Sequence, residues 1–249
     1  MFFDLYTLWL FPAMNKLLPN NFPTHIAKED VQAMPNAQFE GKVVIVDSLE
    51  QLSQAIDYLQ QQEMIGVDTE ARPSFQRGVH YPTALVQIAT EERCFLFRLT
   101  HIGLPKMLAD IFANPAICKV GLAFRDDIKG LRRRREFIPA NCVDIQSVVA
   151  NYGIMELGLQ KIFAIIFGKR ISKSQQLTNW ENNHLTPEQA KYAATDAWAT
   201  LMIYKQLRLT KPLPRREVTA LKRAELEAQQ LHQQQVLAQR QALLPHDNS

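Results

Sequence analysis

Five short and almost uniformly apolar segments constrain the fold of this chain more than any other feature. They cover residues 42–46, 64–67, 83–90, 93–99 and 117–124. Apolar runs of four to eight residues are typical of strands that are covered on both faces. The polar pair Glu91-Glu92 separates the third run from the fourth, which predicts a hairpin. The chain therefore builds a largely buried β-sheet.

Helical patterns alternate with the later strands. Ser48 and Gln51 have the spacing of a capping box, and apolar residues at helical spacing follow up to Leu59. Thr186-Pro-Glu-Gln predicts the start of a helix that runs to about Arg208. Further helices are expected at 104–113 and 157–168, and residues 142–153 read as a strand that passes into a helix. Strands in a meander followed by alternating strands and helices indicate an α/β fold, a mixed sheet with helices on its faces.

The length and the composition fit one main domain with two extensions. The chain has 249 residues, of which 47% are apolar and 21% are charged, as in soluble globular proteins. We expect a loosely ordered N-terminal extension over 1–40, a folded domain over 41–210, and a helical or disordered Gln-rich tail over 211–249. The apolar N-terminus lacks a basic region and is too short to span a bilayer, so neither a signal peptide nor a membrane partner is expected.

Charge and cysteine content add two weaker expectations. A net charge of +3 and a pI near 8.7 are compatible with a polyanionic partner. Cys94, Cys118 and Cys142 lack metal-ligand spacing and lie in or beside apolar runs, which predicts reduced, buried thiols and a cytoplasmic protein.

Two carboxylates end the second apolar segment, MIGVDTE. Asp68 and Glu70 are two residues apart on a strand, so their side chains point to the same face. Two carboxylates on one face suit a hard divalent cation. Taken alone, the pair is more simply explained as a surface turn.

Two later stretches carry further carboxylates. Asp126 and Asp127 follow the apolar segment at 117–124, at the edge of the sheet where α/β folds place their sites, although either could simply cap a helix. Tyr192 and Asp196 are four residues apart and share one helical face. The alternative for these two is a core tyrosine and a partnered aspartate.

Taken in order, these motifs resemble the DEDD superfamily of 3′→5′ exonucleases, in the tyrosine branch that includes ribonuclease D and the Werner exonuclease domain. The similarity runs from about Phe39 to Leu207 through IGVDTEARPSFQRG, KVGLAFRDDIKGL and GKRISKSQQLTNWENNHLTPEQAKYAATDAWATLMIY. The catalytic residues of the family fall on Asp68, Glu70, Asp127, Tyr192 and Asp196. The histidine branch would need a histidine at Lys191, so it does not apply.

The resemblance implies a ribonuclease-H-like mixed sheet of five to six strands flanked by helices. It also implies a metal-dependent 3′→5′ exonuclease that releases nucleoside 5′-monophosphates with two Mg²⁺ or Mn²⁺ ions. The expected metal ligands are Asp68, Glu70, Asp127 and Asp196, with Asp68 bridging both ions. Tyr192 would orient the attacking water, since its ordinary pKa near 10 makes it a poor base.

The expected partner is a single-stranded or 3′-ended nucleic acid. Candidate contacts are Thr69, Arg77, Lys169, Arg170 and Lys173, with a solvated loop as the alternative for the basic residues. Trp180 is expected to anchor its loop to the core rather than to stack on a base.

Two questions about this partner stay open. The similarity of SKSQQLTNW to the Werner domain slightly favours DNA, and ribonuclease D-like processing of RNA is the alternative. An alternative of another class is a nucleic-acid-binding module without catalytic activity. The sequence does not indicate an oligomeric state.

Overall fold

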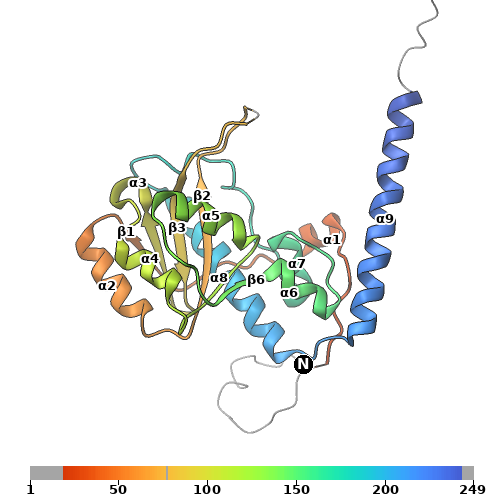
Figure 1. The fold of residues 1–249 in the computed structure, drawn as a ribbon, viewed down its shortest axis with the longest axis horizontal. Coiled ribbons are helices and arrows are strands. Elements are labelled where there is room, and N and C mark those ends of the chain that lie inside the picture. Colours follow the sequence, from red (N-terminus) through yellow and green to blue (C-terminus); the bar gives the residue numbers. More distant parts are fainter. Residues whose placement is uncertain (1–18, 77, 243–249) are drawn as a thin grey trace, which may run out of the picture.

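A mixed six-stranded sheet forms the centre of the protein (Figure 1). The computed structural model describes residues 19–76 and 78–242. The strands lie in the order β1-β4-β3-β2-β5-β6. Their bounds are β1 Lys42–Val46, β2 Met64–Ala71, β3 Thr83–Ala89, β4 Arg93–Arg98, β5 Cys118–Gly121 and β6 Cys142–Asp144. The predicted α/β class and the flanked mixed sheet are confirmed.

The pairing of the strands explains why the sheet is mixed. β2 and β4 both run antiparallel to β3, so the predicted hairpin is confirmed. The pairs β1–β4, β2–β5 and β5–β6 are parallel. β2 therefore lies inside the sheet with a neighbour on each side, and its backbone is held from both edges.

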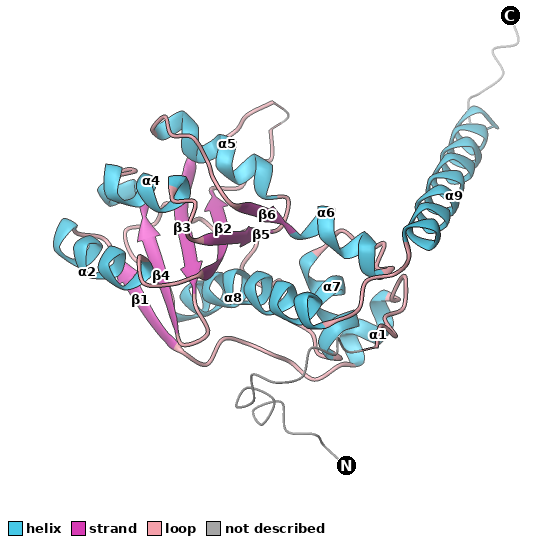
Figure 2. Ribbon diagram, turned by 60° about the horizontal axis from the view of Figure 1, so that its bottom comes forward, coloured by secondary structure: helices cyan, strands magenta, loops and turns pink. Residues whose placement is uncertain are grey.

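Helices cover both faces of the sheet (Figure 2). One face packs against α2 (Leu49–Leu59), α4 (Lys106–Ala113) and α5 (Phe124–Arg134), with Val67, Val86 and Phe97 in the shared core. The other face packs against α8 (Pro187–Leu209) and α7 (Leu159–Phe167). Shorter helices are α3 (Leu99–Ile102), α6 (Ile145–Val149) and the 3₁₀ turn η2 (Ala150–Tyr152). The sequence did not predict α3.

The start of α8 follows its sequence signal closely. The Thr186 hydroxyl accepts a hydrogen bond from the Gln189 amide N–H at 3.2 Å, and the Gln189 side chain accepts one from the Thr186 N–H at 3.1 Å. Pro187 occupies the first helical position, where its missing N–H leaves no bond unmade. The capping box thus sets where α8 begins, and α8 carries Tyr192 and Asp196.

Residues 19–40 are packed against the domain, which differs from the expected loose extension. α1 (Lys28–Ala33) buries Val31, and Phe39 is fully buried. The Phe39 amide N–H donates to the Thr195 hydroxyl of α8 at 3.0 Å. The apolar Val31 and Phe39 lie isolated among polar residues, so no periodic pattern revealed this packing. The part of the extension before residue 19 lies outside the described residues.

The tail contains the long helix α9 (Arg215–Ala242), which extends away from the sheet in Figure 1. Of the two expectations for the tail, helical or disordered, the structure agrees with the helical one. The domain boundaries themselves stay predictions. Within the described residues, no helix combines the length and the apolar character needed to cross a membrane. All three cysteines are free, but only Cys94 is buried, whereas Cys118 is half-buried and Cys142 is exposed. The expectation of three buried thiols was therefore wrong for Cys142.

Candidate active site

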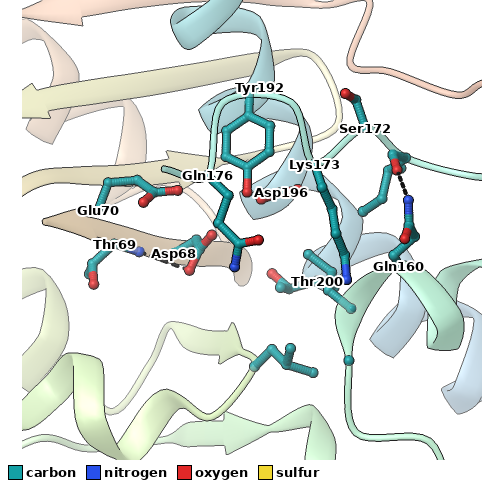
Figure 3. Close-up of a pocket in the computed structure, with 14 residues that line it drawn as sticks. Asp68, Thr69, Glu70, Gln160, Ser172, Lys173, Gln176, Tyr192, Asp196 and Thr200 are labelled. Carbon is teal, nitrogen blue, oxygen red and sulfur yellow. Dashed lines mark hydrogen bonds between the residues drawn. The ribbon is translucent and has the colours of Figure 1, made fainter. Parts of the chain in front are cut away.

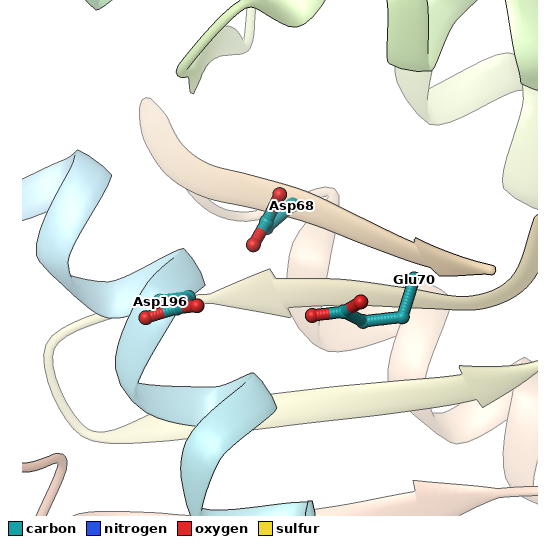
Figure 4. Close-up of side chains that lie close together, drawn as sticks. All are labelled: Asp68, Glu70 and Asp196. Carbon is teal, nitrogen blue, oxygen red and sulfur yellow. The ribbon is translucent and has the colours of Figure 1, made fainter. Parts of the chain in front are cut away.

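Three carboxylates converge between the central strand and the helix that covers it (Figure 4). Carboxylate oxygens of Asp68, Glu70 and Asp196 all lie within 4.8 Å of one another. Strand alternation turns Asp68 and Glu70 toward α8, while Ile65 and Val67, which precede them on β2, enter the opposite core. Asp196 reaches them from α8. The pair that alone suggested a surface turn therefore belongs to a cluster that the tertiary fold assembles.

α8 can come this close because Gly66 has no side chain. A Cβ atom at Gly66 would lie 2.0 Å from the Ala197 carbonyl oxygen, and 2.9 Å from both the Thr200 hydroxyl and the Leu201 Cβ. Helix and strand thus touch backbone to backbone, one residue from Asp196 and two from Asp68. This contact sets the spacing between the carboxylates of the two elements.

The fourth predicted carboxylate, Asp127, comes from the other helical layer. It lies in the first turn of α5 and accepts a hydrogen bond from the Thr69 hydroxyl at 2.5 Å. The Thr69 backbone N–H donates to Asp68 at 2.9 Å. Thr69 therefore links Asp68 and Asp127, which meet at the carboxyl end of β2. The structure thus gives Thr69 a role in orienting carboxylates, in addition to the nucleotide contact expected from the sequence.

Neither Asp126 nor Asp127 caps α5, so that alternative was wrong. The residue before the helix is Ala123, whose backbone is left-handed (φ 52°, ψ 32°), an uncommon conformation for a residue with a Cβ. The carboxylate of Asp144 caps this turn from β6, because it accepts the amide N–H groups of Ala123 and Phe124, both at 3.0 Å. The same carboxylate accepts the Gln146 N–H at the start of α6, also at 3.0 Å.

Asp144 is a positioning residue that the sequence analysis missed. It touches neither Asp68 nor Asp127 through any hydrogen bond of the described residues, yet it holds the turn from which α5 presents Asp127. One local signal was present, since an aspartate that follows an apolar strand commonly caps the next helix. Its second role, as the cap of an earlier helix, depends on β5 and β6 being neighbours.

Tyr192 projects from α8 with its hydroxyl toward Asp196 (Figure 3). Its ring centroid lies 6.0 Å from that of Trp180, which is fully buried. The expectation that Trp180 anchors its loop to the core is confirmed. Burial raises the pKa of the Tyr192 phenol far above its ordinary value, and the neighbouring carboxylates Asp196 and Glu70 raise it further. Tyr192 is therefore a neutral hydrogen-bonding group at any physiological pH.

Burial and mutual repulsion disfavour the ionised form of these carboxylates, and a bound cation would relieve both effects. Burial raises the pKa of Asp68 to about 8, and the negative charge of Asp196 adds to this shift. Burial, and then repulsion from Asp68, act in the same direction on Glu70 and Asp127. Asp196 is raised less, because its hydrogen bond with Tyr192 and the charge of Lys173 both favour its ionised form. Crowded carboxylate oxygens of this kind are the donor set that Mg²⁺ and Mn²⁺ prefer.

Asp68, Glu70 and Asp196 line a cavity of about 290 Å³, whereas Asp127 is not among its lining residues. Its far wall comes from the segments around Gln160 and Lys173 (Figure 3). Besides the carboxylates and Tyr192, the polar side chains that line the cavity are Thr69, Gln160, Ser172, Lys173, Gln176 and Thr200. The cavity thus has a strongly acidic floor and a neutral to basic rim, which can bind a phosphate once cations occupy the floor.

The predicted basic contacts divide into three groups. Lys173 lies at the cavity, as expected. Arg170 does not, because its guanidinium donates to the Met34 carbonyl at 3.2 Å and its backbone pairs with residues 35–37, so it holds the N-terminal segment. Lys169 is exposed and does not line the cavity. Arg77 lies outside the described residues.

Comparison with known proteins agrees with this geometry. The profile of the family described as 3′-5′ exonuclease matches residues 43–210, which cover all five predicted catalytic residues. The chain belongs to this family. A hydrolytic 3′-5′ exonuclease domain therefore occupies most of its length, which argues against the alternative of a module without catalytic activity.

Curated relatives share the domain within longer proteins. The chain is 29% identical over 185 residues to the mouse bifunctional 3′-5′ exonuclease/ATP-dependent helicase WRN, covering 70% of this chain and 13% of that protein. It is 31% identical over 152 residues to a 3′-5′ exonuclease of Arabidopsis thaliana, covering 58% and 52%. A ribonuclease D of Acidiphilium cryptum is 28% identical over 169 residues, covering 66% and 42%. The chain thus spans at most about half the length of these relatives.

Solved structures share the fold. The Nibbler EXO domain of Aedes aegypti aligns with a TM-score of 0.62 at 24% identity, over 74% of this chain and 99% of that one. Escherichia coli RNase D aligns with a TM-score of 0.61 at 23% identity, over 74% and 49%. At this level of identity the alignments support the ribonuclease-H-like architecture alone.

Proposed function

We propose that this protein removes nucleoside 5′-monophosphates one at a time from the 3′ end of a nucleic acid, with two divalent metal ions bound at the carboxylate cluster. The observation that carries the proposal is the convergence of Asp68, Glu70 and Asp196 within 4.8 Å beneath the hydroxyl of Tyr192. The family match supplies the direction of hydrolysis.

The carboxylates divide into two groups around Asp68. Glu70 and Asp196 would share one ion site with Asp68, since carboxylate oxygens of these three lie within 4.8 Å of one another. Asp127, which is bonded to the Thr69 hydroxyl, would hold the second ion together with Asp68. Bound ions would supply an activated water and would neutralise the charge that develops on the entering and leaving oxygens. The raised pKa values support this role, because a bound dication would restore the ionised form of each carboxylate.

Three further residues act on the substrate. Tyr192 keeps its proton and orients the attacking water through its hydroxyl oxygen. Lys173 lies on the opposite wall of the cavity and pairs with the phosphate that is transferred. Thr69 also lines the cavity, where its backbone and side chain would contact the terminal nucleotide.

Whether the substrate is DNA or RNA is a separate question. DNA is the favoured substrate, on the similarity of SKSQQLTNW to the Werner domain, and RNA is the alternative, on the similarity to ribonuclease D. A cytoplasmic location likewise stays a prediction from the sequence.

The test is degradation of a 5′-labelled oligonucleotide by the full chain. Single-stranded DNA, DNA with a recessed 3′ end, and RNA of the same sequence are compared with Mg²⁺, with Mn²⁺ and with EDTA. We expect a ladder that shortens from the 3′ end, nucleoside 5′-monophosphates as the product, and no reaction in EDTA. Asp196→Asn and Asp127→Asn should each lower kcat by at least 100-fold, as is general for removal of an electrostatic group from the reacting centre.

Asp126→Asn is the matched control for Asp127→Asn. Asp126 is the preceding residue, is exposed, and pairs with Lys129 at 2.8 Å on the outer side of α5. Its removal should leave the rate within about twofold of wild type, since a surface ion pair contributes little. Equal rates for Asp127→Asn and Asp126→Asn would refute the assignment of the second ion site.

A further inference from the structure

A second hollow lies beside the catalytic cavity, between two loops. The first loop joins β2 to β3 and extends beyond the sheet, with the segment before α8 next to it (Figure 1). The hollow has a volume of about 400 Å³. Its walls are Arg72, Phe75 and Tyr81 from the first loop, and Leu177 and Asn179 from the second.

The two cavities adjoin each other along the chain. Glu70 lines the catalytic cavity and Arg72, two residues later, lines the second hollow. On the loop before α8, Gln176 lines the catalytic cavity and its neighbour Leu177 lines the second hollow. Two neighbouring residues are only about 3.8 Å apart along the backbone. A strand whose 3′ end occupies the catalytic cavity therefore reaches the second hollow with one of its next nucleotides.

The walls of the hollow have the chemistry of a base-binding site. Phe75 is 85% exposed and Leu177 is 69% exposed, so two large apolar side chains lie in solvent on facing loops. The Arg72 guanidinium lies 4.9 Å from the ring centroid of Tyr81 and is held by Glu181 at 3.7 Å. Aromatic rings and arginine planes are the surfaces on which unpaired bases stack. Asn179 offers an amide that can bond to a base edge.

The charge of the hollow also fits a nucleic acid better than a protein. Among the residues that the structure describes, its lining includes one cation, Arg72, and no carboxylate, and the Glu181 carboxylate that pairs with Arg72 lies outside the lining. The acidic floor of the catalytic cavity ends at Glu70, so the phosphates of an incoming strand would leave the metal ligands and pass to the side of Arg72. A peptide has no phosphates to place at the metal ligands, so nothing would direct it from this hollow into the catalytic cavity.

We propose that this hollow holds an unpaired base upstream of the terminal nucleotide, stacked between Phe75 and Leu177 and against the Arg72–Tyr81 pair. The proposal rests on the proposed exonuclease function, because the catalytic cavity defines where the strand begins. If a base binds in this hollow, substrates longer than one nucleotide gain affinity from that contact. Because the bound base must be unpaired, the hollow also favours single-stranded 3′ ends.

Substrates of increasing length test the proposal. The p-nitrophenyl ester of thymidine 5′-monophosphate occupies only the catalytic cavity, whereas a tetranucleotide also reaches the second hollow. Phe75→Ala and Leu177→Ala should raise KM for the tetranucleotide roughly 5- to 150-fold, the range for loss of one stacked base. Hydrolysis of the ester should stay within twofold of wild type. Leu49→Ala, at a leucine that is 70% exposed on α2, is the matched control and should change neither substrate.

An abasic substrate identifies the nucleotide that binds. Tetranucleotides that lack the base at the second or the third position from the 3′ end are compared with the intact one. The wild type should bind one of the two abasic tetranucleotides about as weakly as Phe75→Ala binds the intact one. Phe75→Ala should bind that abasic tetranucleotide with little further loss of affinity, since the abasic site and the substitution remove the same contact. Unchanged KM for the tetranucleotide in both variants would overturn the proposal, as would an equal loss on the ester.

A binding measurement separates this proposal from the proposed function. The anisotropy of a labelled tetranucleotide is followed in Ca²⁺, where turnover is not needed. If the wild type hydrolyses nothing but Phe75→Ala weakens binding, the exonuclease assignment fails and the base site stands. If the wild type hydrolyses oligonucleotides and both variants bind as it does, the base site fails and the exonuclease stands.

Discussion

Replacing Gly66 with alanine tests whether direct contact between β2 and α8 sets the geometry of the metal site. The new Cβ would lie 2.0 Å from the Ala197 carbonyl oxygen, whereas carbon and oxygen atoms normally approach to about 3.3 Å. α8 must therefore move away from β2 by about 1.3 Å, and the shift separates Asp196 from Asp68. Backbone atoms on both sides leave no flexible side chain that could absorb the clash.

The size of the effect follows from two separate costs. Overpacking of this kind typically lowers the free energy of unfolding by about 1–3 kcal/mol, and for a domain of this size each kcal/mol lowers Tm by about 2–4 °C. A displacement of about 1 Å at a reacting centre reduces the rate by about 100-fold. We therefore expect Gly66→Ala to be folded, with a Tm several degrees lower and a kcat about two orders of magnitude lower.

The assay combines thermal unfolding by circular dichroism with hydrolysis of the p-nitrophenyl ester across a Mn²⁺ titration. Gly130→Ala is the matched control, because its Cβ would meet only the Thr83 hydroxyl at 2.8 Å, a side-chain atom that can rotate, and because alanine favours the helix α5. Gly130→Ala should keep wild-type activity with equal or higher stability. A Gly66→Ala protein with wild-type kcat and Tm would show that the strand–helix contact does not set the carboxylate spacing.

Three further predictions concern the supports of the site. Asp144→Asn replaces a carboxylate that accepts three N–H groups, so it should lower the free energy of unfolding by about 1–3 kcal/mol and raise the Mn²⁺ concentration for half-maximal rate. Adding Ala123→Gly, which relieves the left-handed alanine by about 1 kcal/mol, should recover part of the stability, and an unchanged metal titration would contradict the positioning role. In EDTA, stability should fall as the pH rises from about 5 to 8, because the raised pKa of Asp68 makes the native state bind more protons than the unfolded chain, whose carboxyls titrate near pH 4. Asp68→Asn should flatten this slope in urea titrations at each pH, and identical slopes would refute the cause. Thr186→Ala removes the cap of α8 and should lower the free energy of unfolding by about 1 kcal/mol with kcat intact, which thermal melts and the ester assay would check.

Local patterns in the sequence predicted those features that depend on neighbouring residues. The apolar runs gave the strands, the hairpin followed from Glu91-Glu92, and the capping box placed the start of α8. The ordered motifs pointed to Asp68, Glu70 and Asp196, whose carboxylates meet in the structure, and strand alternation placed Asp68 and Glu70 on one face. These inferences succeed because backbone hydrogen bonding and side-chain periodicity are short-range properties.

Contacts between distant segments were decided by the tertiary structure alone. Arg170 looked like a phosphate ligand but holds the Met34 carbonyl, and the isolated Phe39 is a core residue. Asp144 caps a helix that precedes it in the chain, which only the β5–β6 pairing makes possible. The sequence by itself thus determined which carboxylates are candidates for the site. Their spacing depends on Gly66, Ala123 and Asp144, because ångström-scale geometry arises from close packing between elements and not from the periodicity within them.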